Sequence, residues 1–298
     1  MMTLRSTGID HGELLRGLTL RLPSADRVEL SSGFRPATET DWAETYSEGC
    51  FVPRGPWRAP GRAECAMLFG TPGPGALPGD WIAVLPVPGR VLEASAALRA
   101  VSATGDAAAL DALIEGPAGR LALVEALRWA NGLTDPARPG ILTPFLYGRI
   151  PAGNPTMTTG SHGRRVGLHV DSWDDGPLAE RAAAANRVSA NLGDHDRCLL
   201  VVNAPLAVMA RALAERDLLD GAADPRFALG RRFMQVFPHY PVTKIVVRPG
   251  EAYIAPTDNL LHDGFAEPHG QIDLQFSCRG YFVAPAGGMG SSDVGVAS

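Results

Sequence analysis

Two histidines and one aspartate, placed in two distant parts of the chain, are the side chains best suited to holding a metal ion. They are His169 and Asp171, which are two residues apart, and His262, which comes much later. Two imidazoles and one carboxylate leave several coordination positions of an iron(II) ion open for oxygen chemistry. The three residues are therefore candidate catalytic and metal-binding residues.

The His-x-Asp tripeptide is a weak signal when it is taken alone. The chain has seven His and 32 Asp and Glu residues, so about 0.75 matches to His-x-acid are expected by chance. A second match, His11-Gly12-Glu13, follows Asp10 in a segment typical of a helix start. We interpret that match as a solvated first turn, so the case for His169 depends on its context.

The residues around His169 alternate between apolar and polar types, as expected for a strand. One face carries Val166, Leu168 and Val170, and the other carries His169, Asp171 and Trp173. Successive side chains on one face of a strand lie roughly 6.5 to 7 Å apart, so His and Asp can reach the same ion. A strand over 166–173 would make the pair a chelate.

The distal part of the chain follows similar logic. His262 lies on a short segment that leaves the turn 256–259, and a strand with strict alternation is predicted over 272–279. The polar face of that strand, which ends in Arg279, is either solvated or directed into the cavity of a barrel. In the second case the planar guanidinium of Arg279 is suited to binding a carboxylate.

His-x-Asp on a strand, a distal His after a turn and an Arg on the following strand resemble the 2-oxoglutarate- and Fe(II)-dependent oxygenase superfamily. The resemblance covers roughly residues 142–283. It implies a double-stranded β-helix in which His169, Asp171 and His262 bind iron, while Arg279 pairs with the distal carboxylate of 2-oxoglutarate. Many members of the superfamily have Ser or Thr two residues after this Arg, where the present chain has Tyr281.

Three further residues are candidates for binding the co-substrate or the substrate. Asn191 is a candidate hydrogen-bond donor to 2-oxoglutarate. Arg149 could hold a substrate carboxylate or merely pair with an acid at the barrel rim. Trp173 is in phase with the ligands and could pack on the substrate, although a structural role is equally compatible with its position.

A single domain is expected from 298 residues with 45% hydrophobic content. The predicted fold is mainly β with helical support (α+β), built on a double-stranded β-helix, jelly-roll or cupin-like core. We assign 1–140 to the N-terminal support region, 141–285 to the core with a helical insertion at 204–219, and 286–298 to a flexible tail.

Helical spacing over 107–131, interrupted at Gly116-Pro117, predicts two helices. The other apolar runs from 141 onwards, including 233–237, are predicted strands. The Pro- and Gly-rich segment 53–78 reads as a long loop, either a lid or a surface excursion.

Composition argues against several classes of protein. The net charge of −5 disfavours a nucleic-acid partner held through its phosphates. Four scattered cysteines fit a reducing compartment better than a zinc or disulfide framework. The sequence shows no signal peptide and no apolar run long enough to span a membrane, so a cytoplasmic location is expected. Motifs of zincins, P-loop proteins and α/β-hydrolases are absent.

The resemblance implies hydroxylation of an unactivated C–H bond in a small polar molecule, such as an amino acid or natural-product intermediate. The partners would be that substrate, 2-oxoglutarate and O2, with Fe(II) as cofactor and succinate and CO2 as co-products. Desaturation and cyclisation stay open, whereas Asp171 disfavours halogenation because halogenating relatives leave that position vacant. The alternatives are a cupin-type metalloenzyme that does not use 2-oxoglutarate, and a non-catalytic jelly-roll protein that binds a small molecule.

Overall fold

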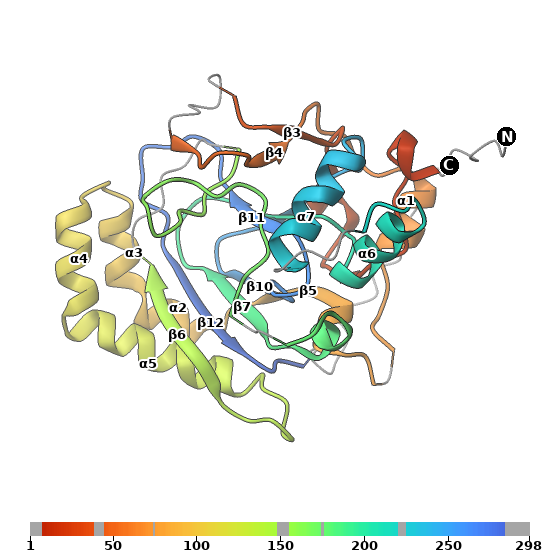
Figure 1. Ribbon diagram of the computed structural model, residues 1–298. Helices are drawn as coiled ribbons and strands as arrows, with labels where there is room; N and C mark the ends of the chain where they lie inside the picture. Colours follow the sequence, from red (N-terminus) through yellow and green to blue (C-terminus); the bar gives the residue numbers. More distant parts are fainter. Residues whose placement is uncertain are drawn as a thin grey trace, which may run out of the picture.

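Two sheets of mainly antiparallel strands form the frame of the protein in the computed structural model (Figure 1). The structure describes residues 8–38, 45–73, 75–147, 155–173, 176–219 and 225–283. Within these ranges the architecture is mixed α/β. The expected combination of antiparallel strands with helical support is confirmed, but β structure does not predominate, because helices pack against both large sheets.

The larger sheet has six strands, which come from both the N-terminal and the C-terminal parts of the chain. In spatial order they are β1 (Thr19–Arg21), β5 (Trp81–Pro86), β10 (Glu251–Ala255), β7 (Asn186–Asn191), β12 (Gln275–Gly280) and β6 (Ile141–Tyr147). Only β1 and β5 are parallel, and the other neighbouring strands are antiparallel.

The smaller sheets complete the β structure. The four-stranded sheet has the order β11 (His262–Phe265), β8 (Arg197–Val201), β9 (Thr243–Val247) and β2 (Val28–Leu30), with antiparallel pairing throughout. Strands β3 (Phe34–Pro36) and β4 (Phe51–Pro53) form a separate antiparallel pair.

Side chains of β7 and β12 alternate between two environments, because successive residues of a strand point to opposite faces. Val188, Ala190, Phe276 and Cys278 are buried in an apolar cluster with residues of α5 (Pro117–Asn131) and the helices before it. Those helices are α2 (Gly89–Ala94), α3 (Ala96–Ser102) and α4 (Ala107–Glu115), and Figure 1 shows α4 and α5 beside this sheet. The other face of β7 and β12 carries buried polar residues, among them Ser277 and Arg279.

A second apolar cluster joins the four-stranded sheet to the remaining helices. It contains residues of β8 and β9 together with residues of α6 (Leu206–Ala214) and α7 (Pro225–Val236). The described residues also form α1 (Arg62–Leu68) and the 3-10 helices η1 (Gly8–His11), η2 (Ala25–Arg27), η5 (Pro78–Asp80) and η6 (Leu178–Ala183).

Some predicted elements are confirmed and others are wrong. The division of 107–131 into two helices is confirmed, since Gly116 ends α4 and Pro117 stands in the first turn of α5. The strand predicted at 233–237 is wrong, because this run belongs largely to α7. Leu229, Phe233 and Phe237 are four residues apart and all buried, which is helical spacing. The loop predicted over 53–78 contains α1.

The helical insertion predicted at 204–219 is confirmed by α6, whereas the predicted tail at 286–298 falls outside the described residues. Among the helices that the structure describes, none is long and apolar enough to cross a lipid bilayer.

Candidate metal centre

His169 and His262 face each other in a short antiparallel contact between the segment before η6 and β11. The backbone N–H of His169 donates to the carbonyl of His262 at 3.1 Å, and the N–H of His262 donates to the carbonyl of His169 at 2.8 Å. Directly opposed residues bring their side chains to within roughly 5 Å. The two imidazole centroids accordingly lie 4.6 Å apart.

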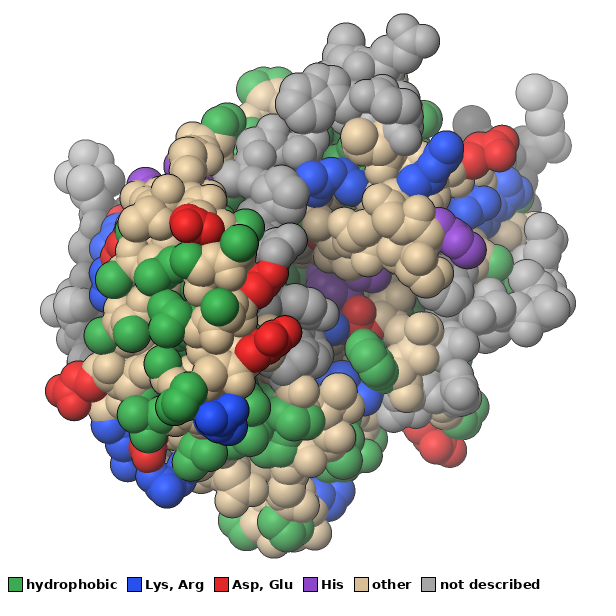
Figure 2. All heavy atoms as spheres, turned by 90° about the vertical axis from the view of Figure 1, so that its left-hand side faces the viewer, with side chains coloured by type: hydrophobic (Ala, Val, Ile, Leu, Met, Phe, Trp, Pro, Cys, Tyr) green, Lys and Arg blue, Asp and Glu red, His purple; other side chains and the backbone are tan. Residues whose placement is uncertain are grey.

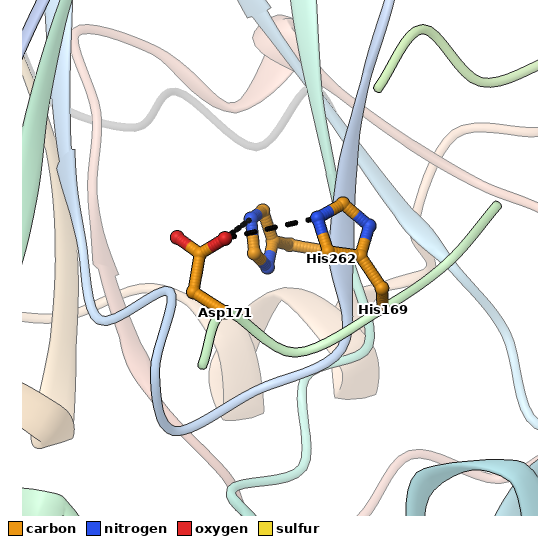
Figure 3. Close-up of side chains that lie close together, drawn as sticks. All are labelled: His169, Asp171 and His262. Atoms are coloured by element: carbon orange, nitrogen blue, oxygen red, sulfur yellow. Dashed lines mark ion pairs between the residues drawn. The ribbon is translucent and has the colours of Figure 1, made fainter. Parts of the chain in front are cut away.

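Asp171 completes a compact group of three possible ligands. Its Oδ1 atom lies 3.7 Å from His169 Nε2 and 3.8 Å from His262 Nε2. The three candidate ligand atoms are all within 4.8 Å of one another, and the side chains point toward a common centre (Figure 3). The structure therefore brings together the three residues that the sequence predicted as ligands.

The backbone that carries these ligands differs from the predicted strand over 166–173. Only His169 makes a ladder contact, and the N–H of Asp171 donates instead to the carbonyl of Thr257 at 2.9 Å. Gly167 has a positive φ of 67°, which interrupts extended structure just before His169. The His-x-Asp chelate thus depends on one backbone bridge and the turn around Thr257 rather than on a continuous strand.

The hydrogen bonds of the imidazoles direct their Nε2 atoms toward Asp171. His169 Nδ1 donates to the carbonyl of Gly167 at 2.8 Å, and His262 Nδ1 donates to that of Leu260 at 3.4 Å. With the proton on Nδ1, each Nε2 atom presents a lone pair, as metal-binding histidines do. His262 Nε2 is buried and has no hydrogen-bond partner in the described part of the chain, so a cation would satisfy it.

Asp263 is a buried neighbour of the cluster that the sequence prediction missed. Its Oδ1 atom accepts hydrogen bonds from Met157 N at 3.0 Å, Thr158 N at 2.9 Å and Thr158 Oγ1 at 2.8 Å. Its Oδ2 atom lies 3.6 Å from His169 Nδ1. A carboxylate behind a ligating imidazole fixes its orientation and raises its basicity. Its position directly after His262 was the only sequence signal for this role.

Burial and charge set different pKa values for the three candidate ligands. Burial lowers the pKa of His262 to about 4, so this imidazole is neutral at pH 7. Burial also disfavours the charged form of His169, but the hydrogen bond and charge of Asp263 outweigh it and raise the pKa of His169. The charges of His262, Arg187 and His169 outweigh the burial of Asp171 and lower its pKa. An ionised carboxylate beside a neutral imidazole suits a divalent cation.

Two arginines lie next to this cluster on neighbouring strands. Arg187 of β7 and Arg279 of β12 are directly opposed in the sheet. Arg187 Nη2 forms an ion pair with Asp171 Oδ2, while Arg279 Nη2 donates to Asp258 Oδ2 at 2.9 Å. The sequence prediction included Arg279 but missed Arg187. The alternation of Arg187, Ser189 and Asn191 along β7 was the signal that could have placed it on the polar face.

The structure separates the other predicted site residues. Trp173 lies near Arg279, whose guanidinium carbon is 5.5 Å from the ring centroid, and its side chain is 53% exposed. Asn191 is at the opposite end of β7, where its amide group donates to the carbonyls of His195 and Val247. These bonds occupy both of its donors, so the structure gives Asn191 a role in positioning backbone instead of one at the cluster. Arg149 lies outside the described residues.

The face of the molecule that carries α4 and α5 shows histidine side chains in a hollow, with acidic and basic side chains beside them (Figure 2). The partial exposure of the His169 side chain, 12%, and of the Asp171 side chain, 9%, agrees with a site that opens to solvent. Two imidazoles, one ionised carboxylate and a buried Nε2 atom without a partner among the described residues fit a divalent metal ion with open coordination positions.

No protein-family model matches the chain, and a search of curated proteins also gives no match, so its interpretation rests on the geometry of this site.

Proposed function

We propose that this protein is an Fe(II)- and 2-oxoglutarate-dependent oxygenase that acts on a small polar organic molecule. The observation that carries this proposal is the convergence of His169 Nε2, His262 Nε2 and Asp171 Oδ1 on one point. Two imidazoles and a carboxylate on one side of an ion leave its other side open, as oxygenases of this class require.

The order of strand pairing supports a double-stranded β-helix around this centre. Along the chain the eight segments are β6, the segment of His169, β7, β8, β9, β10, β11 and β12. The first pairs with the eighth, the second with the seventh, the third with the sixth and the fourth with the fifth, all antiparallel. Such nested pairing across two sheets is the arrangement of a jelly roll.

Arg279 supports the use of an acidic co-substrate. Its side chain is 7% exposed, and only Nη2 is engaged by Asp258. Its Nε atom is buried and finds no partner among the residues that the structure describes. A carboxylate that reached this guanidinium would accept the remaining hydrogen bonds and balance its charge.

The proposal assigns a task to each of five residues. His169, Asp171 and His262 would hold the metal, Arg279 would bind the distal carboxylate of 2-oxoglutarate, and Trp173 would border the substrate at the entrance. Iron(II) with O2 would supply the oxidising chemistry, and oxidative decarboxylation of 2-oxoglutarate to succinate and CO2 would supply two of the electrons. The polypeptide contributes geometry, charge and the exclusion of water.

The Arg279–Asp258 ion pair favours one alternative, a cupin-type metalloenzyme that does not use 2-oxoglutarate. In that case Asp258 permanently satisfies the charge of Arg279, and the metal acts on the substrate alone. The two functions differ in whether 2-oxoglutarate binds beside the metal.

A single set of assays tests the proposal. The protein is first loaded with Fe(II) under anaerobic conditions. It is then mixed with O2, 2-oxoglutarate and each member of a panel of amino acids and natural-product intermediates, and the succinate formed is measured. We expect succinate formation that depends on the substrate, and its loss in His169→Ala, with His239→Ala as a control at an exposed histidine. Stoichiometric iron binding without succinate from any substrate would favour the cupin-type alternative, and absence of metal binding would contradict both.

A further inference from the structure

The two oxygen atoms of Asp171 have different neighbours. Oδ1 faces both candidate histidine ligands, at 3.7 Å from His169 Nε2 and 3.8 Å from His262 Nε2. Oδ2 is taken by the guanidinium of Arg187. The ion pair is largely shielded from water, with 17% of the Arg187 side chain and 9% of the Asp171 side chain exposed. One oxygen is thus directed to the metal centre and the other to an arginine.

We infer that Arg187 is a positioning residue that keeps Asp171 a ligand through one oxygen only. The inference rests on the proposed metal centre, and it adds a residue that acts on that centre through its contact with Asp171. Carboxylates bind cations through either one or both oxygens. An Oδ2 atom released from Arg187 would be free to become a fourth protein ligand, and it would occupy a position that the proposed oxygen chemistry needs open.

The backbone around Arg187 is held firmly enough for this task. Arg187 is an interior strand residue that pairs with Ala255 of β10 on one side and with Arg279 of β12 on the other. Its neighbour Val188 is completely buried on the opposite face. Because the sheet fixes the Cα atom of Arg187, its planar guanidinium can contact Asp171 Oδ2 from only a few positions.

The charge pattern also directs Arg187 toward Asp171. Arg187 and Arg279 are directly opposed in the sheet, and like charges in this relation repel each other. Each guanidinium is paired with its own acid, Arg187 with Asp171 and Arg279 with Asp258. Asp171 thus offsets the charge of Arg187 beside that of Arg279, which favours the contact of Arg187 with Asp171.

Manganese(II) provides a test that needs neither O2 nor turnover, because the relaxation of water protons reports the number of exchanging water molecules on the ion. The proteins to be compared are the wild type, Arg187→Gln, Arg187→Lys and Arg27→Gln. The last is a matched control, because Arg27 also forms a largely buried ion pair, with Glu251, that lies outside the cluster. Occupancy is set to one ion per chain in each protein.

We expect the relaxation enhancement in Arg187→Gln to fall by about one third, since a second oxygen of Asp171 would replace one of about three waters on a six-coordinate ion. Arg187→Lys, which retains a positive donor, should restore most of the enhancement, and Arg27→Gln should match the wild type. Equal enhancement in the wild type and Arg187→Gln at full occupancy would overturn the inference. Failure of the wild type to bind manganese would overturn the metal centre itself. If Arg187→Gln does not fold, Arg187→Met decides, because it removes the donor but keeps the apolar stem. Loss of about one water in this variant supports the inference, and a value equal to that of Arg27→Gln overturns it.

Discussion

The two histidines of the candidate metal centre depend on different neighbours, although they face each other in one backbone bridge. His262 makes hydrogen bonds to the backbone of His169 and Leu260. His169 also has a carboxylate, Asp263, behind its Nδ1 atom at 3.6 Å. The strength of metal binding should therefore depend on Asp263 although this residue is not a ligand.

Asp263→Asn tests this dependence. The variant keeps an oxygen that can accept the hydrogen bonds from Met157 and Thr158, but it removes the negative charge near His169. We expect the affinity for Co(II), measured by calorimetry, to fall by about 10- to 100-fold. Asp273→Asn is the matched control, since Asp273 is also buried and lies 3.3 Å from a histidine, His269, outside the cluster. Equal affinities of the two variants would contradict the role of Asp263.

Arg279→Lys tests the proposed binding of the co-substrate. Lysine retains a positive charge beside buried Asp258, so the protein avoids an unpaired buried carboxylate, but the planar fork of hydrogen-bond donors is lost. We expect the KM for 2-oxoglutarate, measured by succinate formation, to rise about 10-fold while the affinity for the metal stays within about twofold. An unchanged KM would place the carboxylate elsewhere and favour the cupin-type alternative.

Individual residues also show how much of the candidate site could be predicted from the sequence alone. The three candidate ligands and Arg279 could be predicted because their residue types, spacing and flanking turns are local properties, although the strand expected over 166–173 is replaced by one backbone bridge and a turn. Arg187 and Asp263 could not be placed in the same way. Their roles depend on which segments pair in space, and no local pattern states that Arg187 will lie opposite Arg279 or that Thr158 will approach Asp263.

Strand β12 illustrates how one element serves both the core and the site. Its alternation places Phe276 and Cys278 in the apolar cluster beside α5, while Ser277 and Arg279 are buried on the side of the metal centre. The alternation itself was readable in the sequence. The burial of the polar side chains was not, because the same pattern describes a strand with one solvated face.

Cys278→Ala tests the apolar side of this strand through pH. Burial raises the pKa of the Cys278 thiol to about 12, whereas a thiol in the unfolded chain has a pKa of about 8.5. Because the folded pKa is the higher one, the stability it provides is complete below about pH 8.5 and is lost as the pH rises toward 12.

In urea unfolding, Cys278→Ala should be less stable than the wild type at pH 7, because the substitution leaves a cavity. That difference should shrink by roughly 1 to 2 kcal/mol at pH 10, where only the wild type loses the contribution of this thiol. Other groups that titrate in this range, including Cys198 with its pKa near 12, are common to both proteins. A difference that is constant between pH 7 and pH 10 would contradict the assigned burial.

Helix α7 shows why some elements were missed. The run 233–237 is short and apolar, which fits a strand when only five residues are considered. Buried Leu229, one turn earlier, reveals the helical period, but Gly230, Arg231 and Arg232 separate it from the apolar run and reduce the local signal. Contacts with the four-stranded sheet and α6, which stabilise an amphipathic helix, are properties of the folded molecule.

On the scale of the whole molecule, the nested pairing of strands brings the two halves of the candidate metal centre together. His169 and Asp171 belong to the second of the eight segments that pair in this way, and His262 is the first residue of the seventh, β11. An unfolded chain keeps these groups far apart, since closing so long a loop costs conformational entropy. A cation that needs all three ligands should therefore bind the native state and have little affinity for the unfolded one.

Selective binding to the native state predicts stabilisation of the whole fold by the metal. At a free Co(II) concentration 100 times the dissociation constant, the free energy of unfolding should rise by about 2.7 kcal/mol. Thermal or urea unfolding with and without Co(II) measures this change, with Mg(II) as a comparison ion because it prefers oxygen ligands and binds imidazole poorly. In His262→Ala the stabilisation by Co(II) should largely vanish, whereas His239→Ala should retain it. The same stabilisation in His262→Ala would mean that Co(II) binds elsewhere, and the candidate metal centre would then have no thermodynamic support. Because the measurement requires neither O2 nor 2-oxoglutarate, it separates the existence of the metal centre from the chemistry proposed for it.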